Sequence, residues 1–182
     1  MSTTHPVITL DLVLDRHTAK DVLRAVLHSI LFHRLFGTVK AKTFEVLDVT
    51  MPAVDDEATE QLVDQRVDTF WKGIEGGVNK RGQIIVTFSE KKPKKSWFLV
   101  GEEEVPWEEW MINAEIRQPT TERDRQKFNA DLATALTKSL KTMLTHTSSE
   151  TGRAAVPLIT VAQGISPFPY RITVKVNGIE IP

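Results

Sequence analysis

Histidine is the side chain that most readily binds metal ions or transfers protons near neutral pH, and this chain has five histidines. They are His5, His17, His28, His33 and His146. Only His28 and His33 share a predicted helix, where a spacing of five residues separates them by about 140° around the axis. Two histidines that bind one metal ion from a helix are four residues apart. We therefore predict that these histidines are surface or hydrogen-bonded residues and form no metal site.

Carboxylates are the second group that could do chemistry, in the glutamate runs at 102–104 and 108–109. A divalent cation could visit them, but a solvated charged loop explains them better. The chain has no cysteine, which excludes disulfides, thiolate metal sites and cysteine nucleophiles. It also lacks the Gly-x-Ser-x-Gly, His-Glu-x-x-His and glycine-rich phosphate-binding patterns. The sequence thus predicts no enzyme, no cofactor and no bound metal.

The stretch KKPKKSWFLVGEEEVPWEEW, at 91–110, is the most unusual part of the chain. A segment rich in lysine and proline cannot bury itself, so we predict an exposed loop there. Its lysines are Lys91, Lys92, Lys94 and Lys95. Trp97 and Phe98 follow them, and such aromatic residues either fold back under the loop or anchor a protein partner.

The lysine cluster permits a second interpretation. Lys91, Lys92, Lys94 and Lys95 could contact phosphates or lipid headgroups, each contributing about 1 kcal/mol at an anionic surface. The nearby glutamates oppose such binding, and the aromatic residues and wide basic face typical of a nucleic-acid site are missing. A peripheral membrane or nucleic-acid binder is therefore the alternative function, with membrane contact favoured and nucleic acid not expected.

The bulk composition is that of an ordinary soluble domain: 182 residues, 41% hydrophobic, 26% charged and a net charge of -1. No apolar run approaches the roughly 20 residues that span a bilayer. The N-terminus alternates apolar and polar residues without a basic start, which predicts a strand and not a signal peptide. We expect a cytosolic or nuclear protein.

Periodicity predicts the elements in the first half of the chain. Residues 7–14 alternate as a strand, and residues 18–36 form a helix with a wide apolar stripe, Asp21, Arg24 and His28 lying opposite. Residues 44–51 form a second strand whose phase slips between Val46 and Leu47, as in a bulge or in a strand that is apolar on both faces. Asp55 or Asp56 then caps a second helix, and 84–88 is a compact strand.

The second half follows the same logic. Residues 107–117 alternate as a strand, and Thr121 begins a third helix through a capping box. Residues 145–153 are predicted to be a polar loop, 156–161 and 170–176 to be strands, and Asn177-Gly178 to be a hairpin turn before a short edge strand. The tally is about three helices and six or seven strands. It predicts one α+β domain, with helices on one face of a mostly antiparallel sheet.

Several of these motifs, in this order, resemble the autophagy-related protein 101 family. They are the helix sequence AVLHSILFHR at 25–34, the lysines followed by Trp97-Phe98, an acidic stretch and PWEEW at 106–110, TERDRQ at 121–126, and Pro169-Tyr170. The matches spread over nearly the whole chain. The short chain is more typical of fungal than of animal members.

The resemblance implies a fold and a function. It implies a single HORMA domain at 1–182, a central sheet backed by three helices with a protruding Trp-Phe loop. It further implies a non-catalytic scaffold in the cytoplasmic autophagy-initiation kinase complex, acting at the autophagosome assembly site. The implied partner is the HORMA domain of autophagy-related protein 13, bound as a heterodimer through a face that we place on the third helix.

The same resemblance implies that Trp97 and Phe98 form an exposed finger that recruits downstream autophagy factors. Animal members separate the two aromatic residues by one position, whereas here they are adjacent. Neighbours on an extended chain point to opposite sides, so the two rings need not enter one pocket.

Overall fold

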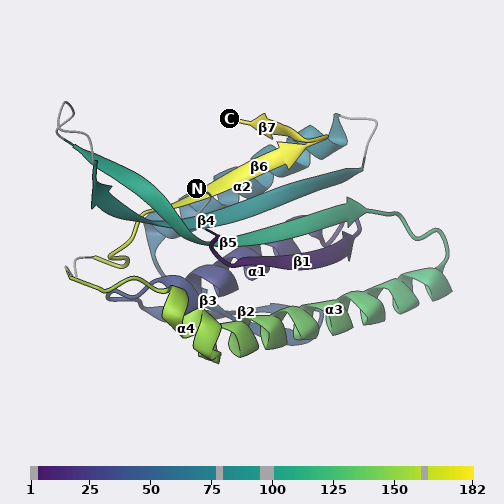
Figure 1. Ribbon diagram of the computed structural model, residues 1–182. Coiled ribbons are helices and arrows are strands. Elements are labelled where there is room, and N and C mark those ends of the chain that lie inside the picture. Colours follow the sequence, from purple (N-terminus) through teal and green to yellow (C-terminus); the bar gives the residue numbers. More distant parts are fainter. Residues whose placement is uncertain (1–3, 77–79, 95–100, 161–163) are drawn as a thin grey trace.

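The computed structural model describes residues 4–76, 80–94, 101–160 and 164–182. Its main layer is a five-stranded sheet in the order β1-β5-β4-β6-β7 (Figure 1). The strands are β1 (Val7–Leu14), β4 (Arg81–Pro93), β5 (Glu102–Ile116), β6 (Tyr170–Val176) and β7 (Ile179–Ile181). Only β1 and β5 run parallel, so the sheet is mostly antiparallel, as predicted.

Helices cover one face of this sheet. They are α1 (Ala19–Arg34), α2 (Glu57–Glu75), α3 (Glu122–Ser148) and the short α4 (Glu150–Ala155). A separate hairpin of β2 (Ala41–Val46) and β3 (Val49–Val54) packs against α1, which therefore has neighbours on several sides. The core lies between sheet and helices, and the α+β class predicted from the sequence is confirmed.

The central position of α1 corrects one prediction. His28 is fully buried, although the apolar stripe placed it on the outer side of the helix. Its ring lies 5.0 Å from the ring of Phe44, so the β2–β3 hairpin covers this side of α1. Asp21 and Arg24 remain outside and bind each other, and Arg24 also binds Asp64 of α2. Periodicity identified the helix but could not show that a second layer covers its polar side.

The predicted bulge near Val46 is a turn. Leu47 and Asp48 have positive φ angles of 52° and 61°, which reverse the chain between β2 and β3. Two residues in the left-handed region form the usual connection of a tight hairpin, normally with Asn or Gly. Because neither residue has that signature, the sequence pattern alone resembles one irregular strand.

The predictions for 145–160 were wrong. Helix α3 continues to Ser148, and α4 follows directly, because the Ser149 side chain accepts a hydrogen bond from the Gly152 backbone N–H. Residues 156–160 form no strand in the described part of the segment. The predicted cap of α3 is correct, since Thr121 accepts from the Asp124 N–H at 3.1 Å. Asn177 and Gly178 form the predicted turn into β7.

Candidate functional site

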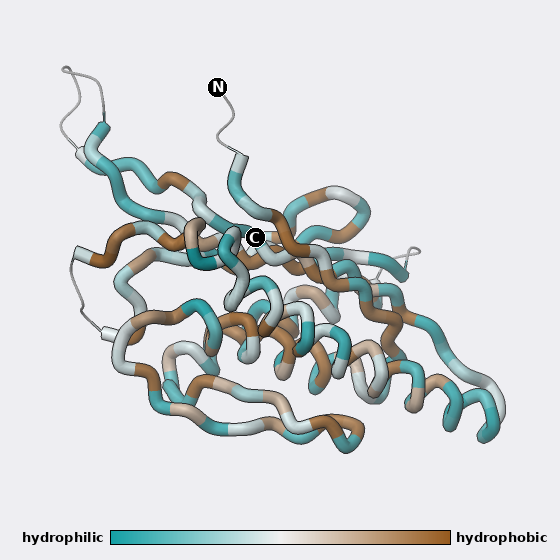
Figure 2. The backbone as a smooth tube through the Cα atoms, turned by 60° about the horizontal axis from the view of Figure 1, so that its bottom comes forward, coloured by the Kyte–Doolittle hydropathy of each residue, from teal (hydrophilic) through white to brown (hydrophobic). Residues whose placement is uncertain are grey.

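Strands β4 and β5 continue beyond the rest of the sheet as a two-stranded ribbon. β6 pairs with β4 only from Gly82 to Phe88, whereas β4 stays paired with β5 as far as Pro93. The register shifts between Phe88 and Ser89, at the point where the ribbon leaves the sheet. The ribbon projects at the upper left of Figure 1 and is mostly hydrophilic in Figure 2.

The ribbon corrects the prediction that the lysine cluster lies in an exposed loop. Lys91 and Lys92 belong to β4, where they pair with Glu104 and Glu103 of β5. Lys94 donates its backbone N–H to the Gly101 carbonyl at 3.0 Å and so closes the ribbon. The segment between them, with Lys95, Trp97 and Phe98, lies outside the described residues, and the predicted finger therefore stays a prediction.

The register also bears on the predicted contact with anionic surfaces. Residues directly opposite each other on antiparallel strands project to the same side. Lys91 and Lys92 therefore each share their side with a glutamate, and Lys92 also lies 3.0 Å from Glu90. Glu104 binds Arg171 of β6 at 3.2 Å. The described ribbon is thus charged on both strands without an excess of positive charge.

Aromatic rings fix the base of the ribbon. Trp107 is 5% exposed, and its ring lies 5.5 Å from the rings of Phe88 and Phe168. The Arg34 guanidinium lies 5.5 Å from the Trp107 ring as a cation–π contact. This packing ties the ribbon to the end of α1 and to the loop before β6.

A buried charge network lies beside these rings. Glu108 has no exposed side-chain surface, and both its oxygens accept hydrogen bonds from Arg34 at 2.7 Å. Trp110 donates its indole N–H at 2.8 Å, and the His146 ring lies 2.5 Å away. Arg34 also donates to the Gly152 carbonyl in α4 at 2.9 Å. The Glu108 carboxylate thus joins β5 to α1 and α3, and Arg34 extends the network to α4.

This network corrects the sequence prediction for Glu108 and refines the one for His146. Glu108 does not lie in a solvated carboxylate loop but is fully buried. Of the two predicted settings for His146, surface or hydrogen-bonded, the structure shows the hydrogen-bonded one. The available signal was the placement of Glu108 between Trp107 and Trp110 on an alternating strand. Glu109, one residue on, lies on the opposite face and contacts His5 at 3.4 Å.

The other candidate ligands stay apart. Among the described residues, no group of three or more histidines and carboxylates is placed to hold a metal ion. No helix in the described ranges is long and apolar enough to cross a bilayer. A hollow of about 880 Å³ lies on the sheet face away from the helices, lined by Asp11, Gln83, Asn113 and Glu115. Asn113 binds Asp11 and Gln83, and hydrogen bonding from Arg117 lowers the pKa of Glu115.

The outer side of α3 is an exposed helical surface near the network. Six residues form one continuous exposed row along it: Ala130, Thr134, Thr137, Lys141, Leu144 and Ser148. Only Lys141 carries a charge, and Leu144 is 58% exposed. Most exposed helix faces are rich in charged residues, which are costly to desolvate, so a row with one charge is easier to bury against a partner.

Comparison with known proteins adds the family. A family model described as autophagy-related protein 101 matches residues 11–163. Proteins of that name are 41% identical over 110 residues in Schizosaccharomyces pombe and 32% identical over 112 residues in Arabidopsis thaliana. These matches cover 60% of this chain in both cases, and 59% and 52% of the relatives. The human protein is 26% identical over 133 residues, covering 64% of this chain and 60% of its own. The matches thus span little more than half the length of these relatives.

Proposed function

Because this chain belongs to the autophagy-related protein 101 family, we propose that it is a non-catalytic adaptor in autophagy initiation. In this proposal residues 1–182 form one HORMA domain. The domain binds and stabilises the HORMA domain of autophagy-related protein 13 as a heterodimer within the autophagy-initiation kinase complex. It acts at the cytoplasmic site of autophagosome assembly.

The observation that carries the recruitment part of this proposal is the projecting β4–β5 ribbon (Figure 1). A two-stranded ribbon alone is marginally stable, but Trp107 and Phe88 fix this one to the core. Such a base fixes the described part of the ribbon, whose last residues, Lys94 and Gly101, lead into the segment at 95–100. We propose that Trp97 and Phe98 in that segment form the recruitment finger, since aromatic residues are the commonest interface anchors.

The test is the double substitution Trp97→Ala with Phe98→Ala. We expect loss of co-precipitation of downstream autophagy factors, with an unchanged melting temperature and intact binding to the partner HORMA domain. The matched control is Lys91→Ala with Lys92→Ala on the same ribbon, which should retain recruitment. If the aromatic double variant unfolds, the rings belong to the core; if recruitment persists in a folded variant, the finger proposal is wrong.

The heterodimer face is the second part of the proposal. We place it on the exposed row of α3, because this row combines a low charge with the protruding Leu144. Leu158 and Ile159, in the segment after α4, are 86% and 41% exposed and are two further large apolar side chains open to solvent.

Co-expression with the partner HORMA domain, followed by size-exclusion chromatography with light scattering, tests this face. We expect a one-to-one complex for the unchanged chain and at least a tenfold weaker complex for Leu144→Asp, as for a central interface residue. Ile179→Asp is the matched control, because Ile179 is 69% exposed on β7. A complex that survives Leu144→Asp but not Ile179→Asp would place the partner at the β7 edge instead.

The alternative of a peripheral membrane or nucleic-acid binder has less support. It uses Lys91, Lys92, Lys94 and Lys95, and the first two have glutamates opposite them. Liposome flotation tests it, with and without anionic lipid and at low and high salt. Lysine-driven binding weakens steeply as the salt concentration rises. Salt-sensitive flotation that is lost in Lys91→Ala with Lys92→Ala would restore this alternative.

A further inference from the structure

The projecting ribbon leaves the sheet through a β-bulge in β5. Phe88 of β4 pairs with Glu108 of β5. The next residue of β4, Ser89, pairs with Pro106, so Trp107 is one extra residue on β5. An extra residue of this kind bends its strand and increases the local twist, and proline is tolerated beside it because proline has no N–H to donate to the ladder. The bulge therefore sets the direction in which the ribbon projects (Figure 1).

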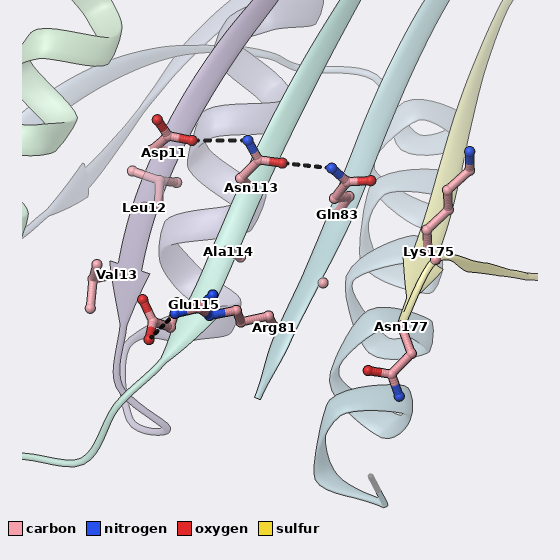
Figure 3. A pocket seen from close by; sticks show the side chains of 12 residues that line it. Asp11, Leu12, Val13, Arg81, Gln83, Asn113, Ala114, Glu115, Lys175 and Asn177 are labelled. Atoms are coloured by element: carbon pink, nitrogen blue, oxygen red, sulfur yellow. Dashed lines mark hydrogen bonds and ion pairs between the residues drawn. The ribbon is translucent and has the colours of Figure 1, made fainter. Parts of the chain in front are cut away.

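The bulge also brings two neighbouring side chains to one face. Neighbours on a regular strand point to opposite faces. Figure 3 shows this in the regular half of β5, where Asn113 and Glu115 project to the face away from the helices and Ala114 between them is buried. At the bulge the alternation is broken, since Trp107 and Glu108 are consecutive and are 5% and 0% exposed. An aromatic ring and a carboxylate thus lie side by side in the interior.

Arg34, the last residue of α1, contacts both of these side chains. Its guanidinium donates to the two carboxylate oxygens of Glu108 at 2.7 Å and lies 5.5 Å from the Trp107 ring. A planar guanidinium can bind a carboxylate with two hydrogen bonds and contact an aromatic ring at the same time, which a lysine ammonium does less well. Arg34 therefore fixes the two residues that define the bulge.

His146 joins the bulge to the end of α3. Its ring lies 2.5 Å from Glu108, and its backbone carbonyl accepts hydrogen bonds from the backbone N–H and the hydroxyl of Ser149, where α3 meets α4. On the other side of this junction, the Gly152 carbonyl accepts from Arg34. The ion pair that fixes the bulge thus also holds the junction of α3 and α4 at two points.

We propose that Arg34 and His146 are positioning residues of the ribbon, which fix the bulge at Trp107 through Glu108. The direction and the order of the ribbon then depend on how the end of α3 is held. Leu144 and Ser148, the last residues of the exposed row of α3, lie on either side of His146 in the chain.

The consequence for regulation rests on the proposed function. A partner HORMA domain bound to the α3 row orders the turn that carries His146, and through Glu108 it orders the ribbon as well. A second protein that binds the ribbon then loses less conformational entropy, so heterodimer formation favours recruitment. Thermodynamic linkage requires the reverse effect too, with a ribbon-bound protein strengthening the heterodimer by the same factor.

Hydrogen exchange of the full chain without a partner, followed amide by amide by NMR, tests the positioning role. The probes are the hydrogen-bonded amides of the ribbon, at 89–93 and 102–105. The reference is the Ile116 N–H, which donates to the Lys80 carbonyl at 2.8 Å at the opposite end of the same two strands. We expect His146→Ala to speed ribbon exchange about tenfold, as for the loss of one hydrogen bond to a charged group, and to leave the reference unchanged.

Two further variants and a control separate positioning from general stability. His146→Gln should restore slow exchange, because its amide N–H can donate to Glu108. Arg34→Lys keeps the charge but loses the paired hydrogen bonds, so it should also speed ribbon exchange. His33→Ala is the matched control, since the His33 ring bonds the Ser29 carbonyl within α1.

The positioning role is overturned if exchange rises equally at the ribbon and the reference, if His146→Gln behaves like His146→Ala, or if His33→Ala has the same effect. It is also overturned if His146→Ala and Arg34→Lys both fail to fold, because the network then serves the whole fold.

Exchange measured by mass spectrometry, with and without an excess of the partner HORMA domain, tests the coupling. We expect the partner to slow ribbon exchange in the unchanged chain and to slow it less in His146→Ala. If no complex forms, the proposed function is wrong, and the measurements on the chain alone still decide the positioning role. If a complex forms and ribbon exchange stays the same, the coupling is wrong and the heterodimer stands.

Discussion

Glu108 is a buried carboxylate whose charge can be compensated only by the side chains around it. A buried carboxylate loses its hydration, and only opposite charge and hydrogen bonds can replace it. Arg34, Trp110 and His146 supply them, with distances between 2.5 and 2.8 Å. Because Arg34 is also buried, each member of the pair depends on the other to compensate its charge.

We predict that Glu108→Gln destabilises the fold by about 3–5 kcal/mol, because the amide keeps the shape but leaves the Arg34 charge without compensation. Urea denaturation at neutral pH measures this loss. Glu109→Gln is the adjacent control, and its half-exposed side chain should change the free energy of unfolding by less than about 1 kcal/mol. Equal effects of the two substitutions would show that the buried pair does not stabilise the protein.

At the scale of single elements, the turn of the β2–β3 hairpin is formed by two residues that are poorly suited to positive φ angles. A non-glycine residue in the left-handed region carries a backbone cost that glycine avoids. The Leu47 side chain packs against the core, so its replacement would also remove that contact. Asp48 has a positive φ angle as well and is therefore the residue to replace.

We predict that Asp48→Gly stabilises the protein by about 0.5–1 kcal/mol through relief of this cost. Thermal unfolding followed by circular dichroism measures the shift. Asp55→Gly serves as a comparison, since the φ angle of Asp55 is not positive. Glycine there relieves no backbone cost, adds chain entropy to the unfolded state and removes the exposed ion pair with Lys40, so it should not stabilise the protein. A lower melting temperature for Asp48→Gly would mean that the Asp48 side chain stabilises the turn.

Elements with a strong period were predicted well from the sequence. The apolar rows of β1 and α1, the caps by Asp56 and Thr121, and the Asn177-Gly178 turn are all local signals. The predictions that failed concern contacts between segments far apart in the sequence, or helix caps outside the expected sequence pattern. α4 extends the helical region because Ser149 caps it and Gly152 fits against the His146 carbonyl, where a Cβ atom would clash.

The candidate site shows the same division. The sequence indicated a charged hairpin with aromatic residues, but the strand register decides that Lys91 meets Glu104. Composition does not determine the register, because the charged residues of both strands are stable in solvent whether or not they face an opposite charge. The ion pair of Arg34 and Glu108 joins residues 74 positions apart, which no local pattern reveals.

At the scale of the whole molecule, His28 lies where α1 meets the β2–β3 hairpin. Burial, with a further contribution from the positive charge of Lys42, lowers the pKa of His28 to about 4. In the unfolded chain the same ring has its ordinary pKa of about 6.5. The unfolded state therefore binds a proton first when the solution becomes acidic, and this favours unfolding.

We predict that His28 contributes a loss of stability as the pH falls from about 6.5 towards 4. Urea denaturation at several pH values measures it, as the difference between the unchanged chain and His28→Asn, whose pH dependence should be shallower over this range. His17→Asn, at an exposed position, should follow the unchanged chain. If all three curves are parallel, His28 titrates alike in both states.

The position of β1 also determines when the chain can fold during synthesis. Val7 at the start of β1 pairs with Glu109, roughly a hundred residues further along, and β4 completes its pairing only with β6 near the C-terminus. A ribosome adds about 5–20 residues each second and hides the most recent ones, so the N-terminal strand waits several seconds for its neighbour. During that time the apolar surface of α1 has no sheet to cover it. We expect the nascent chain to depend on chaperones until β5 has emerged.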